Sequence, residues 1–295
     1  MKKQLLFLLL PLLFIGNVNA QTLYGLYPWD DTDNVVSFVY NEATDSWEYD
    51  AIAGSTGLEY NFGFNLNPAD GQYYLIGYPG DWPPVERNLY RIDNETFAQV
   101  EFITTLVSSD GNDRPQDFAI NSNGEFFIVY QNGTIDQFDL NTLTATPYAT
   151  VGSDHGAVGI TYDWDMDRLL YAHNRDPIEL YEITSGGTVN HLFDFNTPGP
   201  NSGGSAQAIT YAGNGMCYSS STFSWDGLYS IDLDDQTATL LLQPTNSPWS
   251  DYKNLLYPDR PDTTDPAPVP LSNIALYLGF ALIGGFVFFR IYRIS

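Results

Sequence analysis

The chain has little cysteine and little positive charge. Its 295 residues include one cysteine, Cys217, and 11 Lys and Arg residues against 36 Asp and Glu residues. A single cysteine excludes an internal disulfide framework and a cysteine-based zinc site. The formal net charge of −25 argues against nucleic acid as a partner, because phosphate binding needs a surplus of Lys and Arg. Stability must therefore come from a hydrophobic core.

Long apolar runs are confined to the two ends of the chain. At the N-terminus, Lys2 and Lys3 precede the apolar stretch 5–15, and small residues occupy positions 18 and 20 before a cleavage point. This layout is typical of a secretory signal peptide. We predict that residues 1–20 are removed on export, with an uncleaved N-terminal anchor as the alternative.

The C-terminal run, 271–289, contains no charged residue. Its length matches the roughly 20 residues that a helix needs to cross a bilayer. Arg290 and Arg293 follow directly, and positive charge favours the cytoplasmic side. We therefore predict a transmembrane helix or sorting tail over 271–289 and a cytoplasmic tail over 290–295. The Pro- and Asp-rich stretch 258–270 should be an extended spacer.

The order of these C-terminal segments resembles the sorting signals of bacterial surface proteins that sortase-like or exosortase-like membrane enzymes process. The resemblance rests on Pro268-Val269-Pro270, the apolar helix, and Arg290 and Arg293. Val269 stands where the familiar Pro-Glu-Pro form has Glu. The resemblance implies a processing enzyme as a partner, and a permanent single-pass anchor is the alternative.

A short pattern, apolar-Tyr-x-apolar-Asp, recurs between the two ends. Counted at its last residue, successive copies lie 53, 46, 45 and 48 residues apart, at Tyr40, Asp93, Asp139, Thr184 and Asp232. In four of the five units, a pair of short aromatic runs separated by an Asn, Asp or Gly turn comes before it. Each unit then contains four antiparallel strands.

A period in the forties with four strands indicates a β-propeller blade. We predict an all-β propeller over 21–257 with five blades; six blades or a two-sheet sandwich are the alternatives. The first unit lacks its first strand, and 251–257 could supply it, which would close the ring by pairing the two chain ends. The repeat resembles that of bacterial exported β-propellers, and its Tyr and Asp residues are expected to serve packing and turns.

Strand polarity places the longer connections of all blades on one face of such a ring. Four of the six Trp residues fall there: Trp29, Trp82, Trp225 and Trp249. Loops carry function on a rigid scaffold, and Trp beside polar groups suits recognition of sugar or peptide. The alternative is that these Trp residues pack to hold the loops. Our candidate ligand-binding residues are Trp29, Asp81, Trp82, Arg114, His155, His173, Arg175 and Trp225.

A calcium site is the possible cofactor site, since acidic loop residues suit Ca²⁺. The candidate ligands are Asp30, Asp31, Asp33, Asp113 and Asp154. Asp117 and His155 would join Asp113 and Asp154 if these side chains met in the central channel. The acidic stretch 163–167 also resembles part of a calcium loop, but we interpret it as an ordinary turn between two strands.

These features favour a surface-anchored module that binds a glycan, a peptide or another surface protein. A Ca²⁺-dependent hydrolase or lyase on the same scaffold is the second hypothesis. A structural component of an envelope assembly is the third. The expected location is the cell surface or envelope, with the acidic domain outside the cytoplasm.

Overall fold

The computed structural model describes residues 21–27, 35–78, 80, 86–111, 114–152, 158–173, 177–196, 205–222, 227–242 and 254–258. These residues belong to one compact unit and contain twenty β-strands. Within these ranges, no helix has the length and apolar character needed to cross a bilayer. The predicted signal peptide, transmembrane segment and cytoplasmic tail lie outside the described residues, as does all of the spacer except Pro258.

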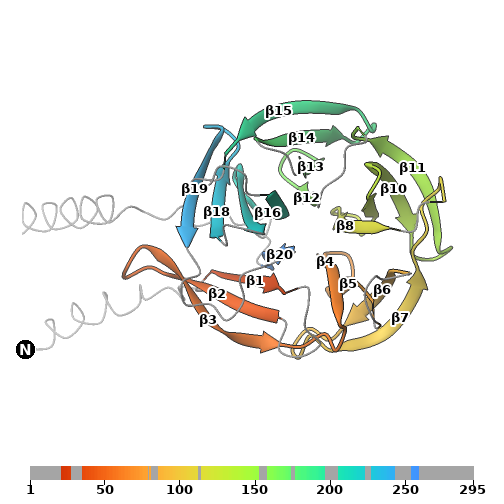
Figure 1. The fold of residues 1–295 in the computed structure, drawn as a ribbon, viewed down its shortest axis with the longest axis horizontal. Helices are drawn as coiled ribbons and strands as arrows, with labels where there is room; N and C mark the ends of the chain where they lie inside the picture. Colours follow the sequence, from red (N-terminus) through yellow and green to blue (C-terminus); the bar gives the residue numbers. More distant parts are fainter. Residues whose placement is uncertain are drawn as a thin grey trace, which may run out of the picture. The chain divides into compact units, whose positions relative to one another are not determined.

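The strands form five four-stranded antiparallel sheets, which are the blades of a propeller (Figure 1). Blade 1 contains, from its inner to its outer edge, β20 (Asn254–Leu256), β1 (Thr22–Leu26), β2 (Val35–Asn41) and β3 (Ser46–Gly54). Blade 2 contains β4 (Tyr60–Asn67), β5 (Gln72–Tyr78), β6 (Asn88–Ile92) and β7 (Gln99–Thr105). Blade 3 contains β8 (Pro115–Ile120), β9 (Phe126–Tyr130), β10 (Thr134–Asp139) and β11 (Thr144–Thr150). Blade 4 contains β12 (Val158–Asp163), β13 (Arg168–His173), β14 (Ile178–Thr184) and β15 (Val189–Phe195). Blade 5 contains β16 (Ser205–Gly213), β17 (Met216–Thr222), β18 (Gly227–Asp232) and β19 (Thr237–Leu242).

The ring is closed by strands from the two ends of the domain. The inner strands contact one another in the cyclic order β4, β8, β12, β16, β20 and back to β4 (Figure 1). β20 pairs with β1 in antiparallel register, with Leu255 opposite Gly25. The predictions of five blades and of a first strand supplied by 251–257 are therefore confirmed.

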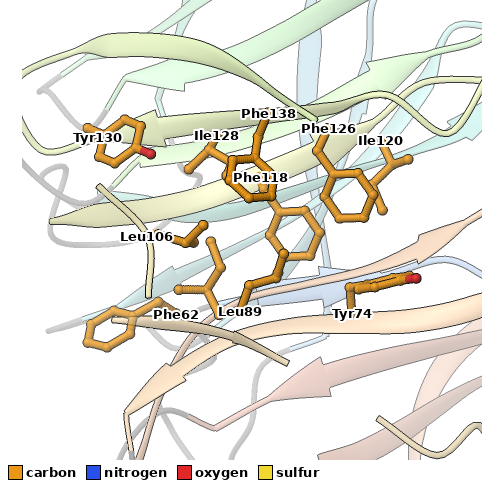
Figure 2. Close-up of a cluster of buried hydrophobic side chains, with 11 residues drawn as sticks. Phe62, Tyr74, Leu89, Leu106, Phe118, Ile120, Phe126, Ile128, Tyr130 and Phe138 are labelled. Carbon is orange, nitrogen blue, oxygen red and sulfur yellow. The ribbon is translucent and has the colours of Figure 1, made fainter. Parts of the chain in front are cut away.

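Apolar side chains fill the spaces between neighbouring blades. Five buried clusters are present, one at each interface. Figure 2 shows the cluster between blades 2 and 3, where Phe62 and Leu89 face Phe118 and Ile128. Because each blade packs on both of its faces, successive residues of its middle strands are apolar. This explains why the sequence repeat is rich in Leu, Ile and aromatic residues.

The repeat performs the two structural roles expected of it. Leu89 lies in the cluster between blades 2 and 3, whereas Tyr90 and Ile92 lie in the cluster between blades 1 and 2. Asp93 ends the strand, and its Oδ1 accepts the amide N–H groups of Glu95 at 3.0 Å and Thr96 at 2.7 Å. These amide groups hold the pKa of the Asp93 carboxyl below its ordinary value.

The turn geometry corrects the alignment of the first repeat by one residue. The repeat aspartates Asp93, Asp139 and Asp232 each precede, by four positions, a residue in the left-handed region. In blade 1 that residue is Asp45, with φ of 54°, so Asn41 takes the place of Asp93. Asn41 Oδ1 accepts the amide N–H of Ala43. Tyr40, which the sequence pattern selected, is therefore one residue out of frame.

The acidic stretch 163–167 is a turn, as predicted. Asp163 Oδ1 accepts the amide N–H groups of Asp165 and Met166, both at 3.1 Å. Its Oδ2 accepts Arg168 Nε at 2.8 Å. Arg168 also contacts Glu182 on the neighbouring strand at 2.5 Å, which lowers the pKa of Glu182. The carboxyl of Asp163 is therefore occupied by the hairpin that it stabilises.

Candidate functional site

The two faces of the ring differ in the connections that they carry. Because every blade is antiparallel, the connections between its first and second and its third and fourth strands emerge on one face, here called the turn face. The remaining connections, including those between blades, emerge on the other, here called the loop face. The longest connection on the turn face has six residues, 93–98, and the longest on the loop face has eleven, 243–253. Sequence and topology together thus assign the long segments to one face.

Most of the predicted site residues lie outside the described residues. These are Trp29, Asp30, Asp31, Asp33, Asp81, Trp82, Asp113, Asp154, His155, Arg175 and Trp225, together with Trp249. The sorting residues Pro268, Pro270, Arg290 and Arg293 also lie outside them. Their roles stay predictions. The structure places two predicted ligand-binding residues, Arg114 and His173.

Arg114 lies on the loop face, directly before β8. Its side chain is exposed, and its Nη1 donates to Gln131 Oε1 at 3.2 Å. Gln131 returns a backbone hydrogen bond to the Arg114 carbonyl at 2.9 Å. Arg87, at the same junction between blades 2 and 3, is buried with its guanidinium 3.5 Å from the centroid of the Phe62 ring. Two cationic side chains therefore occur at this junction.

His173 is a strand residue and not a loop residue. It is the last residue of β13 and is 4% exposed. Its Nδ1 lies 3.1 Å from Glu179 Oε2, which also accepts the Tyr181 hydroxyl at 2.8 Å. The pair lies at the loop-face ends of β13 and β14. It forms a buried polar contact there and not the exposed position that its place in the sequence indicated.

A carboxyl group lies where the inner strands converge. Asp117 of β8 is fully buried, and its oxygens accept the amide N–H groups of Phe118 and Ile160. Asn254 Nδ2 of the closing strand donates to Asp117 Oδ1 at 2.7 Å. Burial raises the pKa of Asp117 well above its ordinary value. Asp117 thus links blade 3 to blade 4 through Ile160 and to blade 1 through Asn254.

Polar side chains also fasten the segment 108–111 to blade 3 on the loop face. Ser109 donates from its amide N and its Oγ to the two oxygens of Asp136, at 2.6 and 2.7 Å. Asp110 Oδ2 accepts Asn132 Nδ2 at 2.7 Å and Thr134 Oγ1 at 3.3 Å. Asp136 is fully buried, whereas Ser109 and Asp110 are exposed. The segment therefore covers a buried carboxylate.

Tyr130 lies beside this carboxylate, at one end of the cluster in Figure 2. It is 1% exposed, and its hydroxyl has no hydrogen-bond partner among the residues that the structure describes. Burial raises the pKa of Tyr130, and the nearby charges of Asp136 and Asp110 raise it further. The Tyr130 hydroxyl therefore stays protonated beside these two acidic side chains.

In the described ranges, no three His, Cys, Asp or Glu side chains come close enough to hold a metal ion. Every calcium candidate from the sequence lies outside these ranges, so the calcium site stays a prediction. Asp117 is the described member of the carboxylate group expected at the channel. Its carboxyl accepts hydrogen bonds from three donors of the ring itself: the amides of Phe118 and Ile160 and the side chain of Asn254.

Sequence reasoning missed Tyr130 and Asp136, although a signal for Asp136 was present. After the bulge between the third and fourth strands, the same position holds Phe38, Tyr90, Asp136, Tyr181 and Tyr229 in blades 1 to 5. Four are aromatic and one is acidic. A charged residue at a buried position of a repeat breaks the rule that the other copies follow, and such breaks mark candidate functional sites.

The sequence matches no protein-family model and no curated protein. Several solved structures resemble the fold. A protein of unknown function from Bacteroides thetaiotaomicron matches with a TM-score of 0.51 and 14% identity, over 80% of this chain and 65% of that one. A chain of a nidogen/laminin complex matches with a TM-score of 0.50 and 12% identity, over 81% of this chain and 98% of that one.

TolB from Acinetobacter baumannii matches with a TM-score of 0.48 and 14% identity, over 77% of this chain. The chain spans 54% of the length of that TolB chain. At these identities the likeness extends to the fold alone. The strand topology shows that this chain contains a β-propeller, a scaffold that presents loops around a ring.

Proposed function

We propose that the protein is a surface-anchored, extracytoplasmic binding module whose loop face recognises a glycan, a peptide or another surface protein. The observation that carries this proposal is the difference between the two faces. Short turns with capped amide groups cover one face, and the longer connections, with four of the six Trp residues of the chain, emerge on the other. Binding residues concentrate on loops that a rigid scaffold positions.

The turn face is a poor binding surface because its polar groups already serve the turns. Asp93, Asp139 and Asp232 each accept amide N–H groups from their own turns. The two Trp residues outside the loop face are used in packing. Trp47 is buried against Tyr218, with ring centroids 5.1 Å apart, and Trp164 packs on Tyr211 at 4.8 Å.

Location outside the cytoplasm is part of the proposal and rests on the sequence of the two ends. An apolar stretch after two lysines at the start, and an uncharged run before two arginines at the end, favour the same orientation. Protease treatment of intact cells tests this directly. We expect the domain to be digested from outside, and full protection in intact cells with digestion after lysis would contradict it.

Arrays of glycans and peptides test the binding function with the full-length protein. Trp82→Ala and Trp225→Ala are the loop-face variants. Met166→Ala is the matched control, since Met166 is 65% exposed on the turn face. We expect both Trp variants to lose about ten-fold or more in affinity for the array ligand, as buried aromatic anchors do. Unchanged binding in both would overturn the loop-face model.

A further inference from the structure

In blade 3, the large and the small residue of two neighbouring strands change places. In blades 1 and 2, the aromatic residue of the third strand, Phe38 or Tyr90, stands diagonally beside a glycine of the second strand, Gly25 or Gly77. In blade 3 the aromatic residue, Tyr130, occupies the glycine position, and the small residue, Asp136, occupies the aromatic one. The exchange places a carboxylate where blades 1 and 2 have an aromatic ring, and a tyrosine hydroxyl where they have glycine.

The Tyr130 hydroxyl and the Asp136 carboxylate do not form a hydrogen bond with each other. In blade 2, Asn88 Nδ2 donates to the Tyr90 hydroxyl at 3.1 Å. In blade 3 the Tyr130 hydroxyl has no such partner among the described residues, although it is fully buried on the same blade face as Asp136. A buried polar group without a hydrogen bond costs the folded state free energy. A site that keeps this cost needs an explanation, and a ligand group that reaches the hydroxyl supplies one.

We propose that this junction of blades 2 and 3 is a binding niche for the ammonium group of a lysine side chain on a peptide or protein partner. The ammonium replaces the Ser109 hydroxyl on Asp136 Oδ1 and contacts the Tyr130 hydroxyl, while Asp110 adds negative charge at the entrance. This inference rests on the proposed function, because it assigns one contact of the loop face to a chemical class of partner.

The chemistry of the niche favours ammonium over a metal ion or a guanidinium. An ammonium has three donors on a compact point charge at the end of a narrow stem. Asp136 offers two oxygens, of which Oδ2 stays bonded to the Ser109 amide while Oδ1 exchanges its donor. A neutral phenol hydroxyl accepts a hydrogen bond but is a weak ligand for Ca²⁺, which takes six to eight oxygens. A planar guanidinium favours both oxygens of a carboxylate, and Asp136 has only Oδ1 to exchange.

Access requires a small movement of the exposed segment 108–111. Ser109 and Asp110 lie at the surface, and Asp136 and Tyr130 lie beneath them. The segment is held to blade 3 by side-chain hydrogen bonds from Ser109, Asn132 and Thr134. Exchange of the Ser109 Oγ bond leaves its amide bond in place. Ser109→Ala should therefore strengthen binding, since it removes the group that the ammonium must displace.

Calorimetric titration of the full-length protein with acetyl-Gly-Lys-Gly-amide tests the niche. We expect the peptide to bind, and its affinity to fall about ten-fold when the lysine is acetylated. The affinity of the unmodified peptide for Asp136→Asn should fall by a similar factor, because a hydrogen bond to a charged group is lost in both cases. Tyr130→Phe should weaken binding about three-fold without lowering the melting temperature, since it removes an unpaired hydroxyl. Tyr162→Phe, on blade 4, is the matched control and should bind as the unchanged protein does.

Three results would overturn the niche: no binding of the lysine peptide, equal binding of its acetylated form, or full affinity in Tyr130→Phe. Binding of CaCl2 that depends on Asp136, without binding of the peptide, would also overturn it in favour of a metal. If Asp136→Asn does not fold, Tyr130→Phe and Ser109→Ala keep the test intact. A failed niche with Trp82-dependent binding of a glycan would leave the proposed function standing.

Discussion

Asp117 places a carboxyl group at the centre of the ring, away from solvent. Its neighbours there are the amide groups of Phe118 and Ile160 and the side chain of Asn254. These donors stabilise the charged form, but burial outweighs them, so the pKa of the carboxyl is raised. Since the raised pKa means that the folded protein holds its proton more tightly than the unfolded chain, Asp117 makes stability depend on pH.

The sign of this dependence gives a prediction for Asp117→Asn. The contribution of Asp117 is fully present below the unfolded pKa of about 3.9 and is lost as the pH rises through the folded pKa. The unchanged protein should therefore lose stability relative to Asp117→Asn as the pH rises above about 4. Melting curves of both proteins across this range provide the measurement.

Asp139→Asn is the control with the opposite sign. The amide N–H of Asn141 holds the pKa of Asp139 below its ordinary value. Its contribution is present above the unfolded pKa and is lost as the pH falls through the folded pKa. The advantage of the unchanged protein over this variant should therefore shrink in acid. An unchanged protein that gains stability relative to Asp117→Asn as the pH rises would contradict our assignment of burial as the dominant effect.

At the scale of elements, the closing strand β20 is short but central. Its three residues are buried, and Leu255 and Leu256 belong to the clusters on the two sides of blade 1. Asn254 adds the contact with Asp117. Without β20, the backbone of β1 would be an open edge at the axis, and open edges invite pairing with other chains.

We therefore predict that Leu255→Ala destabilises the domain strongly. Leu255 is 2% exposed, and truncation of a buried leucine costs about 2–5 kcal/mol through lost burial and the cavity left behind. Leu143→Ala is the control, since Leu143 is 46% exposed on a turn and surface changes of this kind stay within about 0.5 kcal/mol. Denaturant unfolding measures both. Equal midpoints for the two variants would show that closure by β20 contributes little.

The repeat and the turns made the blades predictable, because each strand is a local pattern bounded by Asn, Asp or Gly. Closure of the ring also followed, because the first unit lacked one strand and 251–257 had the composition to supply it. The alignment of the repeat in blade 1 was wrong by one residue. The choice between Tyr40 and Asn41 depends on Asp45, which lies in the left-handed region four residues after Asn41. A sequence pattern does not show backbone dihedral angles.

The site was less predictable than the fold, for a physical reason. Placing Arg114 on the loop face needed only strand polarity, which alternation along the chain reveals. Burial of His173 depends on partners from β14, and the lack of a partner for the Tyr130 hydroxyl depends on how two blades meet. Such facts arise from packing between segments distant in sequence. Asp136 was nevertheless visible as a break in the repeat.

At the scale of the whole molecule, charge is the dominant property. A formal net charge of −25 keeps a protein soluble, but the like charges repel one another across a compact domain. Among the residues that the structure describes, ion pairs reduce this repulsion only locally. Arg168 pairs with Asp163 and Glu182, and Arg91 pairs with Glu101. Repulsion between these charges should therefore lower the stability of the folded ring at low ionic strength.

Added salt should raise the melting temperature of the protein. The screening length falls from about 30 Å at 0.01 M to about 8 Å at 0.15 M salt, which is shorter than the distances across a domain. We expect a rise of several degrees over this range, since ~1 kcal/mol corresponds to about 2–4 °C in a domain of this size. Asp234→Asn with Asp235→Asn, which removes two exposed charges from a turn beside Asp232, should reduce the dependence on salt.

Calcium chloride at matched ionic strength separates general screening from specific binding. If repulsion alone limits stability, CaCl2 and NaCl should raise the melting temperature by similar amounts. A larger effect of CaCl2 that disappears with Asp30→Asn or Asp154→Asn would instead support the calcium site predicted on the loop face, because a ligand that binds only the folded state stabilises it in proportion to its occupancy. A melting temperature that falls with added NaCl would contradict the charge argument, since it would mean that attractive pairs outweigh the repulsion.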